Sequence, residues 1–178
     1  MKIKENIENT LFSQGDDKKK YEDTYTGRLI DQYKAYLITV DALATRRQNT
    51  NNFFLQINTA LIGVLGYITA AKDLTHGWVI FLVFPILGIL ICLSWYRSIK
   101  SYKKLNVVKF DIVHAIEKQL PVAIFDTEWK LLDKAHRPYN PLTRMEFNMP
   151  KILICIYLFI FLINIQLDQV VYFLQNLF

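Results

Sequence analysis

The stretch Trp78–Tyr96, WVIFLVFPILGILICLSWY, contains no charged residue. A helix needs roughly 20 mostly apolar residues to cross hydrocarbon about 30 Å thick, because each residue advances it by about 1.5 Å. Trp78 lies at one end of the stretch and Trp95 and Tyr96 at the other, an arrangement typical of aromatic anchors at a membrane interface. The stretch therefore predicts a transmembrane helix.

Two further blocks lack charge, Phe53–Ala71 and Ile152–Leu167, and the second is followed by Asp168 and an apolar tail. Together the three blocks predict an all-α membrane protein. We expect a two-helix transmembrane hairpin and a third, C-terminal membrane helix, with a small helical cytoplasmic domain. In chain order, the predicted segments are a polar N-terminal arm, 1–24; a cytoplasmic amphipathic helix, 25–52; the first span, 53–71; the second span, 78–96; a cytoplasmic helical region, 97–150; and the third membrane helix with its tail, 151–178.

Basic residues set the predicted orientation. Of the 21 Lys and Arg residues, only Lys72 lies between the first two blocks, and the others occupy 1–52 and 97–151. Positive residues accumulate on the cytoplasmic side of short-looped membrane proteins. This predicts a multi-pass protein of the bacterial inner membrane with a cytoplasmic N-terminus and a hairpin tip, Lys72–Gly77, on the outside.

The basic residues beside the predicted spans are expected to contact anionic headgroups, which accounts for the net charge of +5 without a nucleic-acid partner. These interface residues are Arg46, Arg47, Arg97, Lys100, Lys103 and Lys104.

Prolines and caps predict the helix ends. No proline occurs between Thr24 and Ala71, so the amphipathic helix is expected to continue into the first span. Pro121 is predicted to end the second cytoplasmic helix, and Asp126 to be the N-cap of a short helix over Asp126–Leu132. Another short helix is expected before Pro150.

Polar and very small residues follow one stripe of the first span. They recur every three or four residues, which places them on one helical face: Asn52, Gln56, Thr59, Gly63 and Gly66. One interpretation is close helix packing, since small residues let backbones approach and amides form hydrogen bonds across an interface. The other is the lining of a pore. Both place this face against protein instead of lipid.

The sequence contains none of the common catalytic patterns. A glycine-rich phosphate loop, a Gly-x-Ser-x-Gly elbow and a His-Glu-x-x-His pair are all missing from it. Cys92 and Cys155 fall inside apolar blocks, and the three histidines lie apart from each other and from both cysteines. We therefore expect no enzymatic activity, no cofactor and no metal.

Acidic residues of the cytoplasmic region offer a docking element, formed by Asp126, Glu128 and Trp129. This element could bind the basic residues near the membrane, either within the chain or on a neighbouring subunit. Alternatively, the charged residues recognise an anionic ligand such as a nucleotide second messenger. His114 and Glu117, one helical turn apart, are interpreted as part of a solvated face.

Several motifs resemble a family of uncharacterised small bacterial integral membrane proteins. They include Tyr33-Lys34-Ala35-Tyr36, Arg46-Arg47-Gln48-Asn49-Thr50-Asn51-Asn52-Phe53-Phe54, Leu120-Pro121, Glu128-Trp129 and Pro141-Leu142-Thr143. The resemblance covers roughly residues 33–155 and implies a link with antiphage defence. The layout is also similar to the two-helix SLATT class of membrane effectors, although this chain adds a third membrane segment. Neither resemblance implies a catalytic residue.

Two functions follow as hypotheses. The first is an oligomeric membrane effector, pore-forming or membrane-depolarising, that acts in antiphage defence by abortive infection. The second is a membrane anchor that recruits a cytosolic defence enzyme. The expected partners are the lipid bilayer, further copies of the chain, and a cytosolic sensor or enzyme or a nucleotide second messenger, with no direct contact to nucleic acid.

Overall fold

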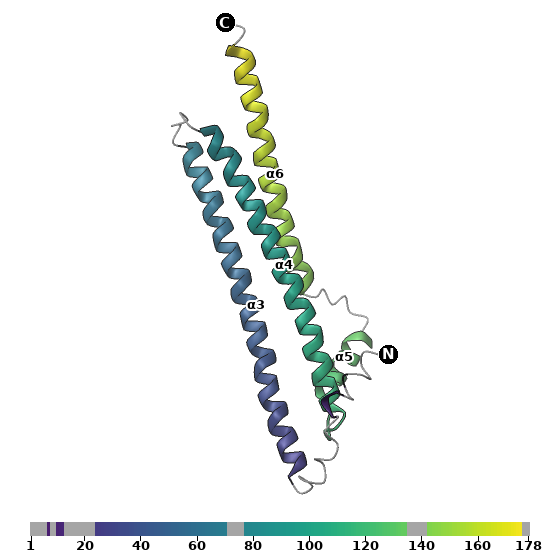
Figure 1. Ribbon diagram of the computed structural model, residues 1–178. Coiled ribbons are helices and arrows are strands. Elements are labelled where there is room, and N and C mark those ends of the chain that lie inside the picture. The colour runs from purple at the N-terminus through teal and green to yellow at the C-terminus, as the bar shows by residue number, and fades with distance from the viewer. Residues whose placement is uncertain (1–6, 8–9, 13–23, 71–76, 135–141, 176–178) are drawn as a thin grey trace. The chain divides into compact units, whose positions relative to one another are not determined.

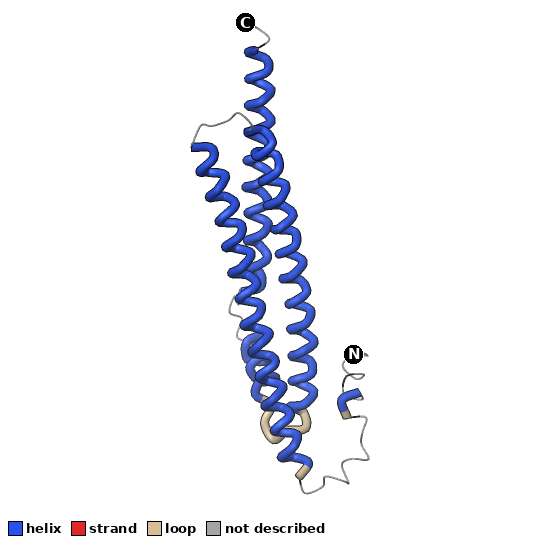
Figure 2. The backbone as a smooth tube through the Cα atoms, turned by 60° about the vertical axis from the view of Figure 1, so that its left-hand side comes forward, coloured by secondary structure: helices blue, strands red, loops and turns tan. Residues whose placement is uncertain are grey.

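The computed structural model describes residues 7, 10–12, 24–70, 77–134 and 142–175. Four helices follow one another along these ranges: α3 (Tyr25–Ala70), α4 (Gly77–Glu117), α5 (Ile124–Lys134) and α6 (Leu142–Gln175) (Figure 1). Figure 2 shows helices joined by loops and turns, with no strand in the described ranges. The prediction of an all-α protein is confirmed for this part of the chain.

Helices α3 and α4 are both longer than a membrane span. Helix α3 is uninterrupted from Tyr25 to Ala70, which confirms the continuity expected from its lack of proline. Helix α4 is also continuous, so no helix end separates the predicted second span from the cytoplasmic region. It ends at Glu117, ahead of Pro121, because the chain tightens there into a turn: the Leu120 amide donates to the Glu117 carbonyl at 3.0 Å.

Two predictions based on helix ends were wrong. Pro150 does not end a helix but lies inside α6, which continues to Gln175. A proline removes one backbone hydrogen bond, and membrane helices tolerate this where neighbouring groups compensate. Asp126 is not an N-cap, since α5 begins at Ile124 and Asp126 lies in its first turn.

Two described helices each contain a stretch long and apolar enough to cross a membrane, within Leu82–Glu117 of α4 and within Met145–Ile163 of α6. The most apolar 18 residues of each have a mean hydropathy of 1.8, and only 11% of that part of α6 is buried within the chain. Exposed apolar side chains are what lipid requires. Membrane helices are thus supported for two of the three predicted segments. Asparagine, glutamine and threonine side chains make the described part of α3 less apolar.

The chain divides into two compact units. Unit 1 comprises 1–46 and 101–140, and unit 2 comprises 47–100 and 141–178. The buried apolar residues of unit 1 are Leu29, Leu43, Val113, Ala115 and Ile116. Those of unit 2 are Leu65, Cys92, Trp95, Ile99 and Tyr157. Most of the predicted polar arm and hairpin tip lies outside the described residues.

Candidate functional site

A single asparagine joins the three helices of unit 2. The Asn58 side chain of α3 is fully buried, and its Oδ1 accepts hydrogen bonds from Tyr157 Oη of α6 at 3.1 Å and from Cys92 Sγ of α4 at 3.2 Å. Its Nδ2 donates to the Phe54 carbonyl at 2.7 Å. Polar groups buried among membrane helices need such partners, because no water reaches them. We refer to Asn58, Cys92 and Tyr157 as the Asn58 cluster.

The Tyr157 ring lies directly against Gly88 of α4. A Cβ added at Gly88 would lie 2.5 Å from Tyr157 Cε1 and Cε2, a separation that real Cβ atoms essentially never show. Both residues are buried. Glycine at position 88 therefore lets the tyrosine reach Asn58 across the helix interface.

A second polar contact connects α3 and α4 near the Asn58 cluster. Trp95 Nε1 donates to Asn51 Oδ1 at 2.9 Å, and the Trp95 ring stacks on Phe54 with centroids 5.9 Å apart. Trp95 is 3% exposed. Its ring and its N–H thus contact α3, and its position at the membrane interface stays a prediction.

Removing the Tyr157 hydroxyl measures its contribution directly. Tyr157→Phe is expected to lower the stability of unit 2 by about 0.5–1.5 kcal/mol, the range for a hydrogen bond between membrane helices. Tyr67→Phe is the matched control, because Tyr67 is 76% exposed. Unfolding by denaturing detergent should show a loss for the first variant alone, and an equal response of both variants would contradict the prediction.

The predicted interface residues divide into two groups. Arg47 is half-buried and pairs with Glu146 of α6 at 3.1 Å, so its guanidinium contacts protein. The side chains of Arg46, Arg97, Lys100, Lys103 and Lys104 are exposed, and their contact with anionic headgroups stays a prediction.

The polar stripe of α3 does not face the other helices of unit 2. Its members are all exposed: Asn52, Gln56, Thr59, Gly63 and Gly66. In the described part of the chain, no other helix comes within 4 Å of a Cβ placed at Gly63 or Gly66. By contrast, Asn58 and Leu65 of the same helix are buried. The described helices of the chain therefore do not cover the stripe.

In unit 1, a buried carboxylate joins α3, α4 and α5. Glu117 is 1% exposed, and its Oε1 accepts hydrogen bonds from Tyr33 Oη and the Phe125 amide, both at 3.0 Å. Its Oε2 accepts the Asp126 amide at 3.1 Å. Amides in the first turn of a helix have no partner within that helix, and an anion is favourable there. Glu117 of α4 thus caps α5, and the interpretation of Glu117 as solvated was wrong.

The surroundings of Tyr33 keep its hydroxyl protonated, so that it donates a hydrogen bond to Glu117. Burial, and after it the nearby Glu117 carboxylate, raises the pKa of Tyr33 to about 12. Close by, Lys109 Nζ of α4 donates to Thr39 Oγ1 of α3 at 2.7 Å, and the Phe110 and Phe125 rings meet edge to face. Side-chain contacts therefore join all three helices of unit 1.

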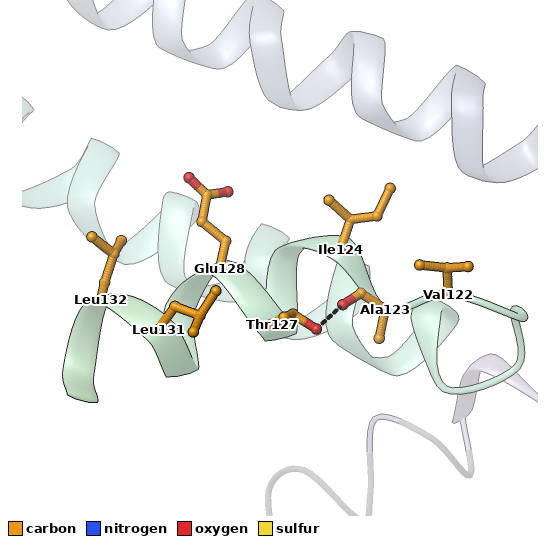
Figure 3. Close-up of a pocket in the computed structure, with 7 residues that line it drawn as sticks. All are labelled: Val122, Ala123, Ile124, Thr127, Glu128, Leu131 and Leu132. Carbon is orange, nitrogen blue, oxygen red and sulfur yellow. Dashed lines mark hydrogen bonds between the residues drawn. The ribbon is translucent and has the colours of Figure 1, made fainter. Parts of the chain in front are cut away.

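The predicted docking residues all lie on α5 but differ in their surroundings, and their role in docking stays a prediction. Asp126 is half-buried and pairs with Lys130, whereas Glu128 and Trp129 are exposed. An open groove of about 760 Å³ runs along α5 and the turn before it (Figure 3). This α5 groove is lined by Val122, Ala123, Ile124, Thr127, Glu128, Leu131 and Leu132.

A smaller pocket of about 210 Å³ lies beside Asp126 in unit 1. It is lined by the charged residues Asp111, Lys118, Asp126 and Lys130, and His114 also lines it. Because both signs are present, the lining does not single out an anionic ligand. The described residues contain no group of three His, Cys, Asp or Glu side chains that could hold a metal ion.

Comparison with known proteins identifies a family. No curated protein and no solved structure matches the chain. The family model described as "Octameric membrane protein family (8xMP)" matches residues 30–166, which include most of α3 and α6 and all of α4 and α5. The matched region thus contains both candidate membrane segments and both polar clusters. The chain belongs to the Octameric membrane protein family, and it is an oligomeric membrane protein.

Proposed function

We propose that this protein is an effector of bacterial antiphage defence which, once triggered, lets ions cross the cell membrane and depolarises it. The observation that carries the proposal is the exposed polar stripe of α3, from Asn52 to Gly66, in a chain of an octameric family. The link with defence comes from the resemblance described above.

The proposal requires α3 to cross the bilayer as well, in addition to α4 and α6. The stretch Phe53–Ala71 carries no charge and is long enough to do so. The distribution of basic residues then places the N-terminus in the cytoplasm of a multi-pass inner-membrane protein. Amide side chains facing hydrocarbon are unfavourable because lipid offers them no hydrogen-bond partner.

Oligomerisation supplies the missing partner. In a ring, each copy can turn its stripe toward a neighbour or toward the central axis. Glycines at 63 and 66 allow a close approach of helices, and the Asn52, Gln56 and Thr59 side chains can bind water or ions once the helices separate. The two interpretations of the stripe then describe a closed state and an open state. A cytosolic sensor or enzyme, or a nucleotide second messenger, would act as the trigger.

Replacing the polar side chains tests this function. Asn52→Leu combined with Gln56→Leu is expected to abolish depolarisation, because an apolar ring repels water and ions. The measurement is the membrane potential of cells expressing the protein during phage infection, followed with a voltage-sensitive dye. Phe53→Leu is the matched control, since Phe53 is an exposed apolar residue of α3 outside the stripe.

Mass measurements in detergent show whether the variant still assembles. A variant that is fully assembled and still depolarises infected cells would contradict the proposal. If the protein were instead an anchor for a cytosolic enzyme, changes in α5 would abolish protection while changes in the stripe would not.

A further inference from the structure

Unit 1 exposes apolar side chains in the α5 groove. Ile124 and Leu131 are 62% and 63% exposed, and Val122 and Leu132 lie beside them (Figure 3). Glu128 is the charged residue of the groove. The groove therefore combines an apolar floor with a single negative charge.

A second apolar surface in unit 1 lies on α4. Leu105, Val108 and Ile112 follow one another at spacings of three and four, so they share one face of the helix. Leu105 is 46% exposed and Val108 is 50% exposed. Lys104, also exposed, precedes Val108 by one helical turn. We call Leu105, Val108 and Ile112 the α4 ridge.

These surfaces differ in setting from the exposed apolar residues of unit 2. The part of α3 that belongs to unit 1 carries Arg28, Asp31, Lys34 and Asp41, charges that keep this unit out of hydrocarbon. Apolar side chains exposed to water are unfavourable, and a contiguous patch of them marks an interaction site. Lipid cannot cover them here, so another protein surface must.

We propose that the α5 groove of one copy binds the α4 ridge of the next copy, outside the membrane. The occupant follows from the octameric assembly of the family. A ring with more than two members needs a head-to-tail contact between two different surfaces of each chain, repeated until the ring closes. The groove and the ridge lie on different helices of the same unit, as such a contact requires.

The charges beside the two surfaces are complementary. Glu128 of the groove would meet Lys104, which flanks the ridge of the neighbouring copy. Such a pair contributes mainly to specificity and register, while the apolar side chains contribute most of the affinity. This inference rests on the octameric assembly of the family and holds whether or not the assembled protein conducts ions.

A charge exchange tests the pairing. Glu128→Lys and Lys104→Glu each place like charges at the contact, and each is expected to shift the purified protein in detergent from octamers to smaller species. The double variant restores opposite charges and should restore the octamer. Light scattering measures the mass. Failure of both single variants to weaken the octamer would overturn the pairing.

Cross-linking tests the apolar contact independently. In a Cys155→Ser background, Leu131→Cys combined with Val108→Cys is expected to give a disulfide ladder that extends to eight subunits. Neither single cysteine should give a ladder, because the contact is not symmetric. The matched control combines Leu131→Cys with Val107→Cys, whose side chain lies on another face of α4.

Two results would overturn the contact. One is the absence of the ladder in a protein shown to be octameric. The other is an intact octamer in Leu131→Glu, because a charge placed among the apolar side chains of the contact should break it. Neither readout of assembly depends on membrane potential, so a failure here is distinct from a failure of the proposed function.

Discussion

Glu117→Ala is expected to destabilise unit 1 by about 3 kcal/mol or more, because hydrogen bonds to a buried charged group contribute about 1.5–3 kcal/mol each and are only partly replaced by water. The substitution leaves the Tyr33 hydroxyl and the amides of Phe125 and Asp126 without their acceptor. Helix α5 has 11 residues, too few to be stable alone in water. Loss of its cap should therefore release α5 before the rest of the unit.

Hydrogen exchange followed by mass spectrometry measures this effect segment by segment. Protection of the α5 amides is expected to fall sharply in Glu117→Ala, while the segments of unit 2 keep theirs. Gln119→Ala is the matched control, since Gln119 is an exposed polar residue two positions after Glu117 and outside the α5 groove; a surface change of this kind is expected to alter stability by less than about 0.5 kcal/mol. Equal effects of the two variants would contradict the capping role.

Glu117→Gln separates charge from shape. The glutamine side chain keeps one oxygen that accepts hydrogen bonds. Its NH₂ group replaces the other oxygen and faces a group that is itself a donor. We expect a loss smaller than that of the alanine variant but clearly above that of the control. If the glutamine variant matches the wild type, the negative charge at the start of α5 contributes nothing to its stability.

The absence of charge predicted the candidate membrane segments of α4 and α6, because a charged side chain in hydrocarbon is costly whatever its neighbours are. Helical periodicity also identified the stripe of α3 as one face. Periodicity does not show what a face contacts. Asn58 lies next to Thr59 in sequence, yet it is buried at the meeting point of three helices while Thr59 is exposed.

Partners distant in sequence explain the other errors. Glu117 reads as a surface residue by its charge, and only its contacts with Tyr33 and α5 make its burial favourable. Arg47 likewise has a partner far away in the sequence, Glu146, and its contact with headgroups stays a prediction. A single sequence does not indicate such pairs. The prediction of a helix end at Pro150 was wrong because it considered only the local effect of proline on the backbone. It did not include the neighbouring helices that support α6.

Gly88→Ala should separate α6 from α4 in unit 2. Two effects oppose each other: alanine favours the helix by up to about 1 kcal/mol relative to glycine, and overpacking a buried contact costs about 1–3 kcal/mol. The added methyl group would overlap the Tyr157 ring, and a shift of the ring away from α4 would strain its hydrogen bond to Asn58. That bond adds about 0.6 kcal/mol or more to the cost. The net result is a destabilisation of about 1–3 kcal/mol.

The cause can be assigned with two further variants, all measured by unfolding in denaturing detergent. Gly27→Ala is the matched control, because no described atom lies within 4 Å of a Cβ at that position of α3, and the helix-favouring effect of alanine should act there alone. In a Tyr157→Ala background the ring is absent, so Gly88→Ala should then cost nothing or become stabilising. If Gly88→Ala still lowers the stability in the absence of the ring, something other than Tyr157 requires glycine at position 88. That result would contradict the role of this pair in packing α4 against α6.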